Sequence, residues 1–211
     1  MTNELTSWGL LVGLGAFHGL NPGMGWLFAV ALGMQDRRRG AVIRALLPLA
    51  AGHALAVAAA LVAVLSVGTI LPGNGLRPMV AGVLVALGAL RLVRHKHPRW
   101  ASMRVGMGGL TCWSFLMATA HGAGLMVVPI YVGMTMAGAG EHAHHVMPRT
   151  GGGAALLATG LHGAGYLIVT ALVALLVFEK VGVGLLRRAW FNLDLVWASA
   201  LVATGALTLA L

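Results

Sequence analysis

The sequence TGLHGAGYLIVTALVALL, Thr159–Leu176, runs for 18 residues without an Asp, Glu, Lys or Arg. A helix needs about 20 predominantly apolar residues to cross a bilayer, and this stretch lies within an apolar segment of that length, at about residues 153–178. Five further segments have the same character and cover about residues 8–34, 42–70, 77–93, 109–136 and 190–211. The chain is therefore predicted to be an all-α integral membrane protein with six transmembrane helices.

The composition supports a lipid-facing surface. Of the 211 residues, 59% are hydrophobic and only 9% are charged, whereas a soluble domain has about a quarter of its residues charged. The net charge of +9 comes from short clusters between apolar segments, and no basic face is present that would indicate nucleic-acid binding. The single cysteine, Cys112, excludes a disulfide within the chain.

The basic residues predict the orientation. Twelve of the 14 Lys and Arg residues fall on one side of an alternating six-span model, and they are Arg37, Arg38, Arg39, Arg44, Arg91, Arg94, Lys96, Arg99, Arg104, Lys180, Arg187 and Arg188. Loops rich in Lys and Arg remain cytoplasmic, so we expect both termini on the periplasmic side of a bacterial inner membrane. Residues 1–211 form one transmembrane domain in this scheme, with halves of about 1–94 and 105–211 joined by the basic cytoplasmic loop 95–104.

The two halves carry similar segments. AFHGLNPGMG (Ala16–Gly25) in the first span resembles TAHGAGLMVVP (Thr119–Pro129) in the fourth, and AAGHALAVAAALVAVL (Ala50–Leu65) in the second resembles Thr159–Leu176 in the fifth. Each pair shares a histidine beside a small residue. Because three is an odd number of spans, the second copy is reversed in the membrane. The pattern predicts two inverted three-helix repeats, which are common in secondary transporters.

Four histidines fall near the middle of the predicted spans, namely His18, His53, His121 and His162. At about 1.5 Å of rise per residue, each lies roughly 14 to 18 Å from one end of its span, in a hydrocarbon core about 30 Å thick. One alternative is that each is a neutral histidine hydrogen-bonded within the bundle. Four ionisable side chains at one depth favour a shared substrate or ion site instead.

The first span contains residues that disrupt a helix. Pro22 lacks an N–H and clashes with the carbonyl four residues earlier, and Gly23 loosens the same turn. The sequence predicts a broken helix whose freed backbone groups line a cavity, with Asn21 among the ligands. Met24 is a candidate soft ligand for a metal ion. Pro129 predicts a weaker break in the fourth span.

Other polar residues are weaker candidates. Asp194, at the start of the sixth span, is either a proton-relay group or a helix-start charge. The predicted outer loop carries a histidine-rich tract, His142, His144 and His145, of a kind that binds transition metals. We expect no enzyme, because the chain has no Gly-x-Ser-x-Gly, His-Glu-x-x-His or paired-carboxylate motif, and the buried nucleophile candidate Ser114 has no base at a fixed spacing.

The residues His18-Gly19-Leu20-Asn21-Pro22-Gly23-Met24-Gly25 resemble the first-helix motif His-Ala-x-x-Pro-Gly-His-Gly-Lys of the nickel/cobalt exporters, a branch of the lysine-exporter superfamily. The motif similarity covers about the first 65 residues. It implies six spans, an outer N-terminus, inverted halves and a transported metal ion. The second motif histidine is Met24 here and the motif lysine is Trp26, and a His/Met pair suits a softer ion such as Cu(I) better than Ni²⁺.

The leading functional hypothesis is an exporter of a transition-metal cation or another small solute, with His18, His53, His121 and His162 as its ligands. No resident cofactor is expected. The alternative is a haem-binding or membrane-anchor subunit of a redox complex, in which two histidines on adjacent helices hold one haem b. The expected partners are the lipid bilayer and the transported solute or ion. A homo-oligomer or a partner in a membrane complex stays open.

Overall fold

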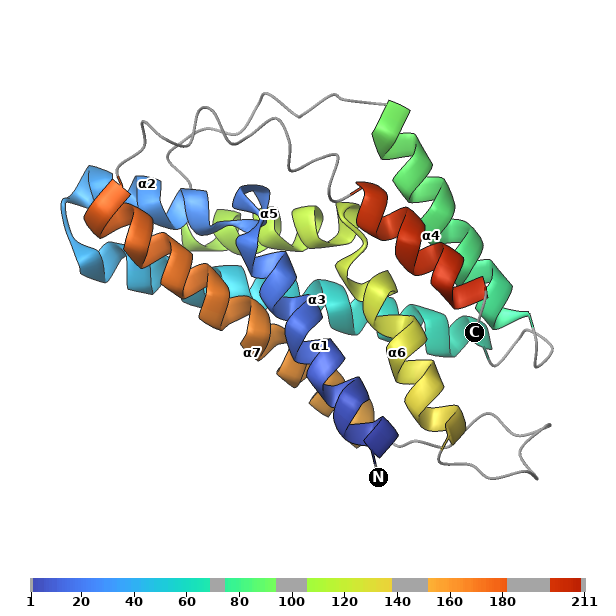
Figure 1. Cartoon of the computed structure of the whole chain (residues 1–211). Coiled ribbons are helices and arrows are strands. Elements are labelled where there is room, and N and C mark those ends of the chain that lie inside the picture. The colour runs from blue at the N-terminus through green and yellow to red at the C-terminus, as the bar shows by residue number, and fades with distance from the viewer. Residues whose placement is uncertain (1, 69–74, 94–105, 138–151, 182–197, 210–211) are drawn as a thin grey trace.

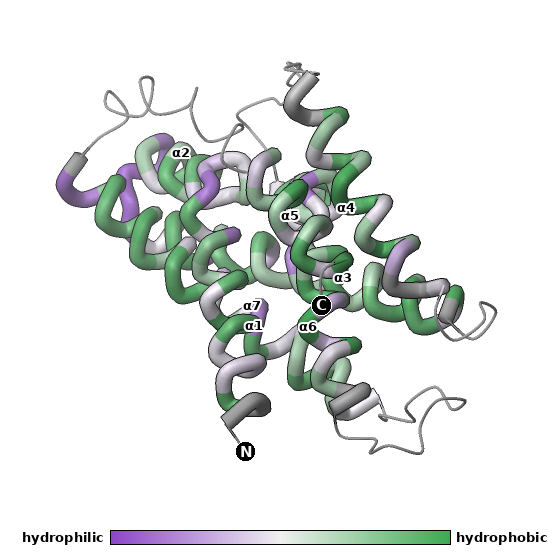
Figure 2. Tube along the Cα trace, turned by 45° about the vertical axis from the view of Figure 1, so that its right-hand side comes forward, coloured by the Kyte–Doolittle hydropathy of each residue, from purple (hydrophilic) through white to green (hydrophobic). Residues whose placement is uncertain are grey.

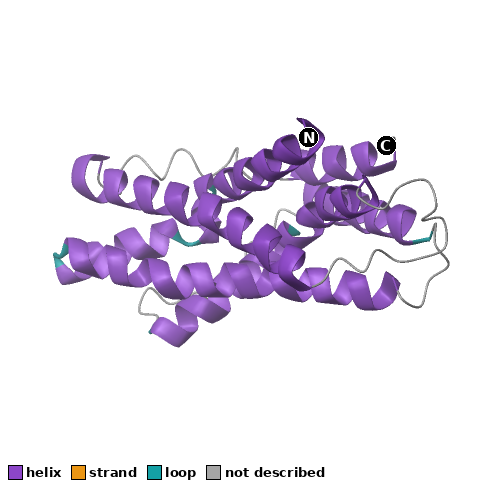
Figure 3. Cartoon of the chain, turned by 90° about the horizontal axis from the view of Figure 1, so that it is seen from below, coloured by secondary structure: helices purple, strands orange, loops and turns teal. Residues whose placement is uncertain are grey.

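The computed structural model describes residues 2–68, 75–93, 106–137, 152–181 and 198–209. Every regular element within these ranges is a helix, and none of the described residues forms a strand (Figure 3). The all-α prediction is confirmed for this part of the chain. The predicted loop 95–104, the tract with His142, His144 and His145, and Asp194 lie outside the described residues.

The elements follow one another along the chain as shown in Figure 1. They are α1 (Thr2–Leu20), the 3₁₀ turn η1 (Pro22–Met24), α2 (Trp26–Asp36), α3 (Arg39–Gly68), α4 (Leu76–Val93), α5 (Met107–Ala120), α6 (Ala123–Ala137), α7 (Gly152–Leu176), the π-helical turn η2 (Val177–Val181) and a last helix over Ala198–Leu209. Apolar residues dominate all of the longer helices, as the colouring of Figure 2 shows.

The predicted first span is not one continuous helix. It consists of α1 and α2, which are separated by η1. Asn21 has an extended backbone with φ −72° and ψ 120°, and its side-chain oxygen accepts a hydrogen bond from the Gly23 N–H at 2.9 Å. Gly25 follows with φ 129°, a backbone conformation that L side chains rarely adopt. The break therefore occurs where Asn21-Pro22 predicts it.

The predicted fourth span is also broken, but not at Pro129. It consists of α5 and α6, whose axes differ by 60°, and the break falls at His121–Gly122. Gly122 has φ 69°, which glycine adopts without the steric penalty of a β-carbon. Pro129 lies inside α6. The prediction of a break at Pro129 is wrong, because the left-handed glycine turns the chain two helical turns earlier.

Two helices are long and apolar enough to cross a membrane, over Arg39–Val67 and Gly152–Lys180. The bent pair α5–α6 makes a third span if it crosses as one unit. The described residues thus show two or three candidate spans by length and composition, fewer than the six predicted. The first predicted span is divided at η1. Within the described residues, the third and sixth spans contribute the shorter apolar stretches Pro78–Leu90 of α4 and Ala198–Leu209.

The surface of these helices is largely apolar. Leu47 on α3 is 77% exposed and Leu156 on α7 is 73% exposed, and further exposed leucines and isoleucines occur along most of the helices. The long helix α3 has 30 residues, which at about 1.5 Å per residue exceeds the roughly 30 Å of a hydrocarbon core. An apolar exterior around long helices is the arrangement that a bilayer favours.

Glycine contacts determine which helices pack together and in which direction. On α1, Gly15 touches the backbone of His162 and Tyr166, and Gly19 touches Tyr166 and Thr170 one turn further on. Residue numbers increase together on both sides, so α1 and α7 run parallel, side by side in Figure 1. Small residues allow this close approach of two helix backbones.

The second half of the chain repeats this parallel packing. Gly52 of α3 touches Thr111 and Phe115 of α5, and Gly124 of α6 touches Ala56 and Val57 further along α3. The broken pair α5–α6 therefore runs parallel to α3, as α1 runs parallel to α7.

The remaining two helices form an antiparallel pair. Gly88 of α4 touches Ala198 and Val202, whereas Gly205 of the last helix touches Ala81 and Leu84. The same arrangement is visible in Figure 1, where the last helix lies beside α4.

Candidate functional site

Four helices contribute the histidines that the sequence predicts near the middle of the spans. His18 lies in the last turn of α1, His53 in the middle of α3 and His162 in α7, while His121 caps the C-terminus of α5. The side chains of His18, His53 and His162 are 0% exposed, and His121 is 2% exposed. The structure thus buries all four, among helices whose outward faces are apolar.

Three of the four histidines converge. The ring centroids of His18 lie 5.7 Å from His53 and 5.1 Å from His162, and the centroids of His53 and His162 are 5.2 Å apart. The Nε2 atoms of His53 and His162 are separated by 3.1 Å, a hydrogen-bond distance. His121 also interacts electrostatically with His18. His18, His53 and His162 together form the histidine cluster.

Backbone carbonyls orient these rings. The Nδ1 atom of His18 lies 2.7 Å from the Leu14 carbonyl, and that of His162 lies 3.2 Å from the Leu11 carbonyl. A carbonyl only accepts, so each Nδ1 carries the hydrogen in a neutral ring and each Nε2 carries the lone pair. His121 has the same arrangement, with Nδ1 at 2.8 Å from the Met117 carbonyl.

This assignment determines the tautomer of His53. Because Nε2 of His162 has the lone pair, the Nε2–H of His53 donates to it across 3.1 Å. The Nδ1 atom of His53 is then an acceptor, and it is buried without a hydrogen-bond partner. A buried acceptor without a partner is costly, and it is available to a proton or a metal cation.

The residues at the α1–α2 break have roles other than those predicted. The amide oxygen of Asn21 caps η1 by accepting from Gly23, and its Nδ2 is buried without a hydrogen-bond partner. The amide group that Asn21 has left is therefore its NH₂, a hydrogen-bond donor, and a donor does not bind a cation. The Met24 side chain is 0% exposed and packs in an apolar cluster.

Side chains satisfy the carbonyls that the break frees. Trp26 donates its indole N–H to the Leu20 carbonyl at 3.0 Å, and Trp113 donates to the Gly23 carbonyl at 3.2 Å. These backbone oxygens are engaged by indoles. The prediction that freed backbone groups line a cavity is therefore wrong for these two carbonyls, because each already accepts a hydrogen bond from an indole N–H.

Tyr166 is a site residue that the sequence analysis missed. Its ring lies on the His53 ring with a centroid distance of 3.9 Å and an angle of 4° between the planes. Its hydroxyl donates to the Met24 carbonyl at 2.7 Å, and Ser114 and Thr170 lie beside it. The position of Tyr166, four residues after His162, could have indicated a shared helix face.

The buried hydroxyl of Ser114 also has a structural partner. It donates to the Leu49 carbonyl at 2.6 Å and so links α5 to α3.

The metal prediction finds limited geometric support. Among the described residues, no group of three or more His, Cys, Asp or Glu side chains is arranged to hold a metal ion. Two nitrogens that bind one tetrahedral ion at about 2.05 Å are roughly 3.3 Å apart, close to the 3.1 Å between Nε2 of His53 and His162. That pair can therefore chelate once the hydrogen between the rings is displaced.

Comparison with protein-family models, with curated proteins and with solved structures gives no match for this chain. The resemblance of the His18–Gly25 motif to the lysine-exporter superfamily therefore stays a prediction. The chemistry of the site rests on its own residues.

Proposed function

We propose that this chain is a six-span membrane transporter that carries a small cation, a transition-metal ion first of all, through the histidine cluster. The observation that carries this proposal is the convergence of His18, His53 and His162 from three helices, fully buried beside a broken helix. Ionisable side chains at membrane depth are rare, face the bundle interior or a cavity, and mark ion or proton pathways.

The helix directions support two inverted repeats. In the proposed repeat, the first span corresponds to the fourth and the second to the fifth. The first span packs parallel to the fifth through Gly15 and Gly19, and the fourth packs parallel to the second through Gly52 and Gly124. The third and sixth pack on each other. This pattern is unchanged when the two halves are exchanged, as an inverted repeat requires.

Two broken helices occupy corresponding positions in the proposed repeat. The first break follows His18 and the second follows His121. Interrupted helices at matching positions of two halves indicate the substrate site of a secondary transporter. Rocking of one half against the other would then expose the histidine cluster to each side in turn.

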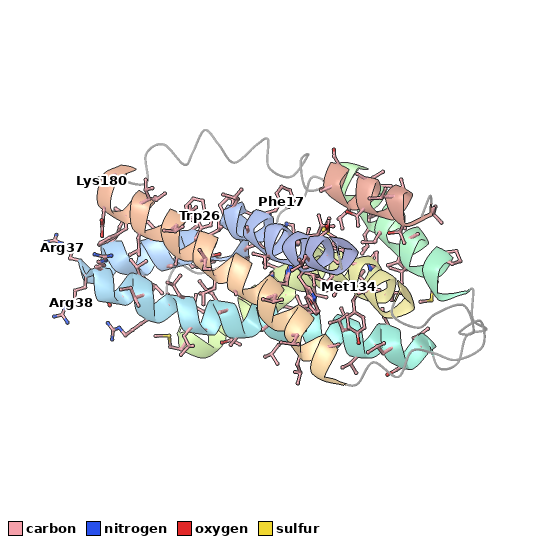
Figure 4. The ribbon with its side chains drawn as sticks, turned by 60° about the horizontal axis from the view of Figure 1, so that its bottom comes forward. Phe17, Trp26, Arg37, Arg38, Met134 and Lys180 are labelled. Atoms are coloured by element: carbon pink, nitrogen blue, oxygen red, sulfur yellow. The ribbon has the colours of Figure 1, made fainter. Side chains whose placement is uncertain are left out.

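The charged end of the molecule supports the orientation. Arg37, Arg38 and Lys180 lie together at one end (Figure 4), and all three are exposed. Arg39 and Glu179 join the same end through an ion pair of 3.3 Å. This end faces the cytoplasm in the proposal, with the chain in a bacterial inner membrane and both termini outside.

The ring orientations suit a cation. In a histidine that binds a metal ion, the N–H of the second ring nitrogen donates a hydrogen bond to a carbonyl or carboxylate. This bond directs the lone pair of the first nitrogen at the ion. His18, His121 and His162 have this arrangement through Leu14, Met117 and Leu11. Neutral imidazole binds a metal ion and its protonated form releases it, so proton entry is a means of driving release.

The pair His53 and His162 does not favour the haem alternative. Two axial nitrogens on opposite sides of one iron ion, each at roughly 2 Å, are about 4 Å apart. The Nε2 atoms of His53 and His162 are 3.1 Å apart and their rings are nearly parallel at 14°. Tyr166 covers one face of His53. The visible absorption spectrum of the purified protein tests this alternative, since bound haem b produces a Soret band.

The experiment for the transporter compares metal accumulation in cells that express the wild-type chain, His18→Ala or Leu20→Ala. Leu20 lies two residues from His18 on α1 and is 52% exposed, so it controls for expression and for mutation of the same turn. We expect wild-type and Leu20→Ala cells to accumulate less of one transition metal than His18→Ala cells do. Equal accumulation in all three strains for Ni²⁺, Co²⁺, Zn²⁺ and copper would refute the metal proposal.

A further inference from the structure

Tyr166 connects the two parts of the proposed site. Its ring contacts the histidine cluster through His53, and its hydroxyl contacts the break through the Met24 carbonyl. The side chain is 0% exposed. It therefore spans the distance between the residues that would hold an ion and the backbone turn that separates α1 from α2.

The stacking contact depends on the charge of His53. A neutral imidazole on a phenol ring gains the ordinary energy of an aromatic pair. An imidazole that binds a proton or a metal cation becomes electron-poor, and its attraction to the face of the tyrosine ring increases as in other cation–π contacts. The orphan acceptor on His53, its Nδ1 atom, is one place where that charge can arrive.

The hydroxyl contact depends on the position of the ring. The Met24 carbonyl lies in η1, directly before Gly25 with its φ of 129°. When Tyr166 stays on His53, its hydroxyl holds this carbonyl at 2.7 Å and keeps the turn in place. When the ring moves, the carbonyl loses its donor in an apolar environment. The free-energy cost of this unpaired acceptor favours a rearrangement of the turn.

We infer that Tyr166 is the positioning residue that makes the conformation of the α1–α2 break depend on whether the histidine cluster is occupied by a cation. The inference rests on the proposed transport function, and it adds the element that couples the ion to the moving helix. Tyr166 itself needs no direct bond to the ion.

Two tryptophans report on the break, because each donates to a carbonyl beside it. Trp26 donates to Leu20 and Trp113 donates to Gly23, on either side of Asn21 and Pro22. We would label the six tryptophans of the full chain with 5-fluorotryptophan and assign the resonances of Trp26 and Trp113 by single Trp→Phe variants. The purified protein is then titrated with Ni²⁺, Co²⁺, Zn²⁺ and Cu(I) in turn.

In the wild-type chain, the ¹⁹F resonances of Trp26 and Trp113 should move as the metal saturates. Tyr166→Phe keeps the ring and removes the hydroxyl, so the metal Kd should change by less than about twofold while the resonances stay in place. Turnover in proteoliposomes should fall about tenfold at unchanged KM, because the buried Met24 carbonyl loses its donor. Tyr131→Phe, which removes the hydroxyl of a buried tyrosine in α6, should keep the metal-induced movement of the Trp26 and Trp113 resonances.

The outcomes separate the two proposals. If metal binds and His18→Ala weakens binding, but Tyr166→Phe keeps the full resonance shift and wild-type turnover, the coupling role is wrong and the transport proposal stands. Metal binding to wild type without any movement of Trp26 or Trp113 also overturns the coupling role. If no metal binds, both proposals fail.

A second measurement avoids the Tyr166 variant in case it does not fold. The chain has two tyrosines, so 3-fluorotyrosine labelling gives two resonances that Tyr131→Phe assigns. The Tyr166 resonance should shift on metal binding and the Tyr131 resonance should not. A Tyr166 resonance that stays unchanged at metal saturation overturns the inference.

Discussion

Gly15→Ala tests the helix contact that brings His18 and His162 together. A β-carbon at Gly15 would collide with the His162 carbonyl oxygen, and it would lie 2.8 Å from the carbonyl carbon of His162 and 3.0 Å from the Tyr166 nitrogen. Restoring even the carbon contact from 2.8 Å to the 3.4 Å of ordinary packing moves the helices apart by 0.6 Å. All three obstacles are backbone atoms, so no side-chain rotation relieves them.

The magnitude follows from this geometry. Adding a methyl group to a closely packed position costs about 1–3 kcal/mol, and we expect about 3 kcal/mol because only backbone can move. A chain of this size changes its melting temperature by about 2–4 °C per kcal/mol, so the apparent melting temperature in detergent should fall by roughly 6–12 °C. His162 should also move away from His18, and metal binding should weaken.

The matched control is Gly13→Ala, two residues earlier on α1, where a β-carbon meets nothing within 4 Å. Alanine is favoured over glycine inside a helix by roughly 0.5–1 kcal/mol, so this variant should be as stable as wild type or slightly more stable. Both are measured as the fraction of protein that stays monodisperse after heating in one detergent. Equal melting temperatures for Gly15→Ala and Gly13→Ala would show that α1 and α7 do not meet at Gly15.

Three further substitutions test other contacts. Gly25→Ala places a β-carbon on a residue with φ 129° and against Leu49, so it should lower stability by about 1–3 kcal/mol; a melting temperature equal to wild type would contradict this backbone conformation. Ser114→Ala removes the buried 2.6 Å hydrogen bond to the Leu49 carbonyl and should cost about 1–3 kcal/mol, whereas Thr111→Val, which removes an exposed bond within α5, should cost clearly less in the same assay. Arg39→Gln breaks the ion pair with Glu179, whose side chains are 61% and 41% exposed, so stability should fall by less than about 1 kcal/mol. That small difference should disappear in 1 M salt, and a larger or salt-independent loss would mean that Arg39 has another partner.

The sequence by itself determined the class of the molecule and the position of its first break. Long segments without charge permit only helices in a lipid environment, because every backbone polar group must find a partner within its own segment. Pro22 has no N–H to donate, so the helix ends at Leu20 wherever the segment lies. The depth of the four histidines also follows from counting residues along each span.

The sequence did not locate the second break or the number of spans in the described residues. Pro129 was the visible helix breaker, yet the chain turns at Gly122, where a φ of 69° costs glycine little. A proline inside a helix can be accommodated locally by its neighbours, so its presence alone does not decide where a span bends. The third predicted span does form one helix, α4 (Leu76–Val93), so in this segment the sequence located the helix correctly.

Only the tertiary structure decided which histidines meet and what else joins them. Depth along a helix is a property of the sequence, but the face that a histidine presents depends on how each helix is rotated against its neighbours. Gly15 and Gly165 determine that rotation for α1 and α7, because a glycine without a β-carbon lets its own backbone approach the backbone of the other helix. The contact of α1 with α7 places His18 against His162 and brings Tyr166 onto both His53 and Met24.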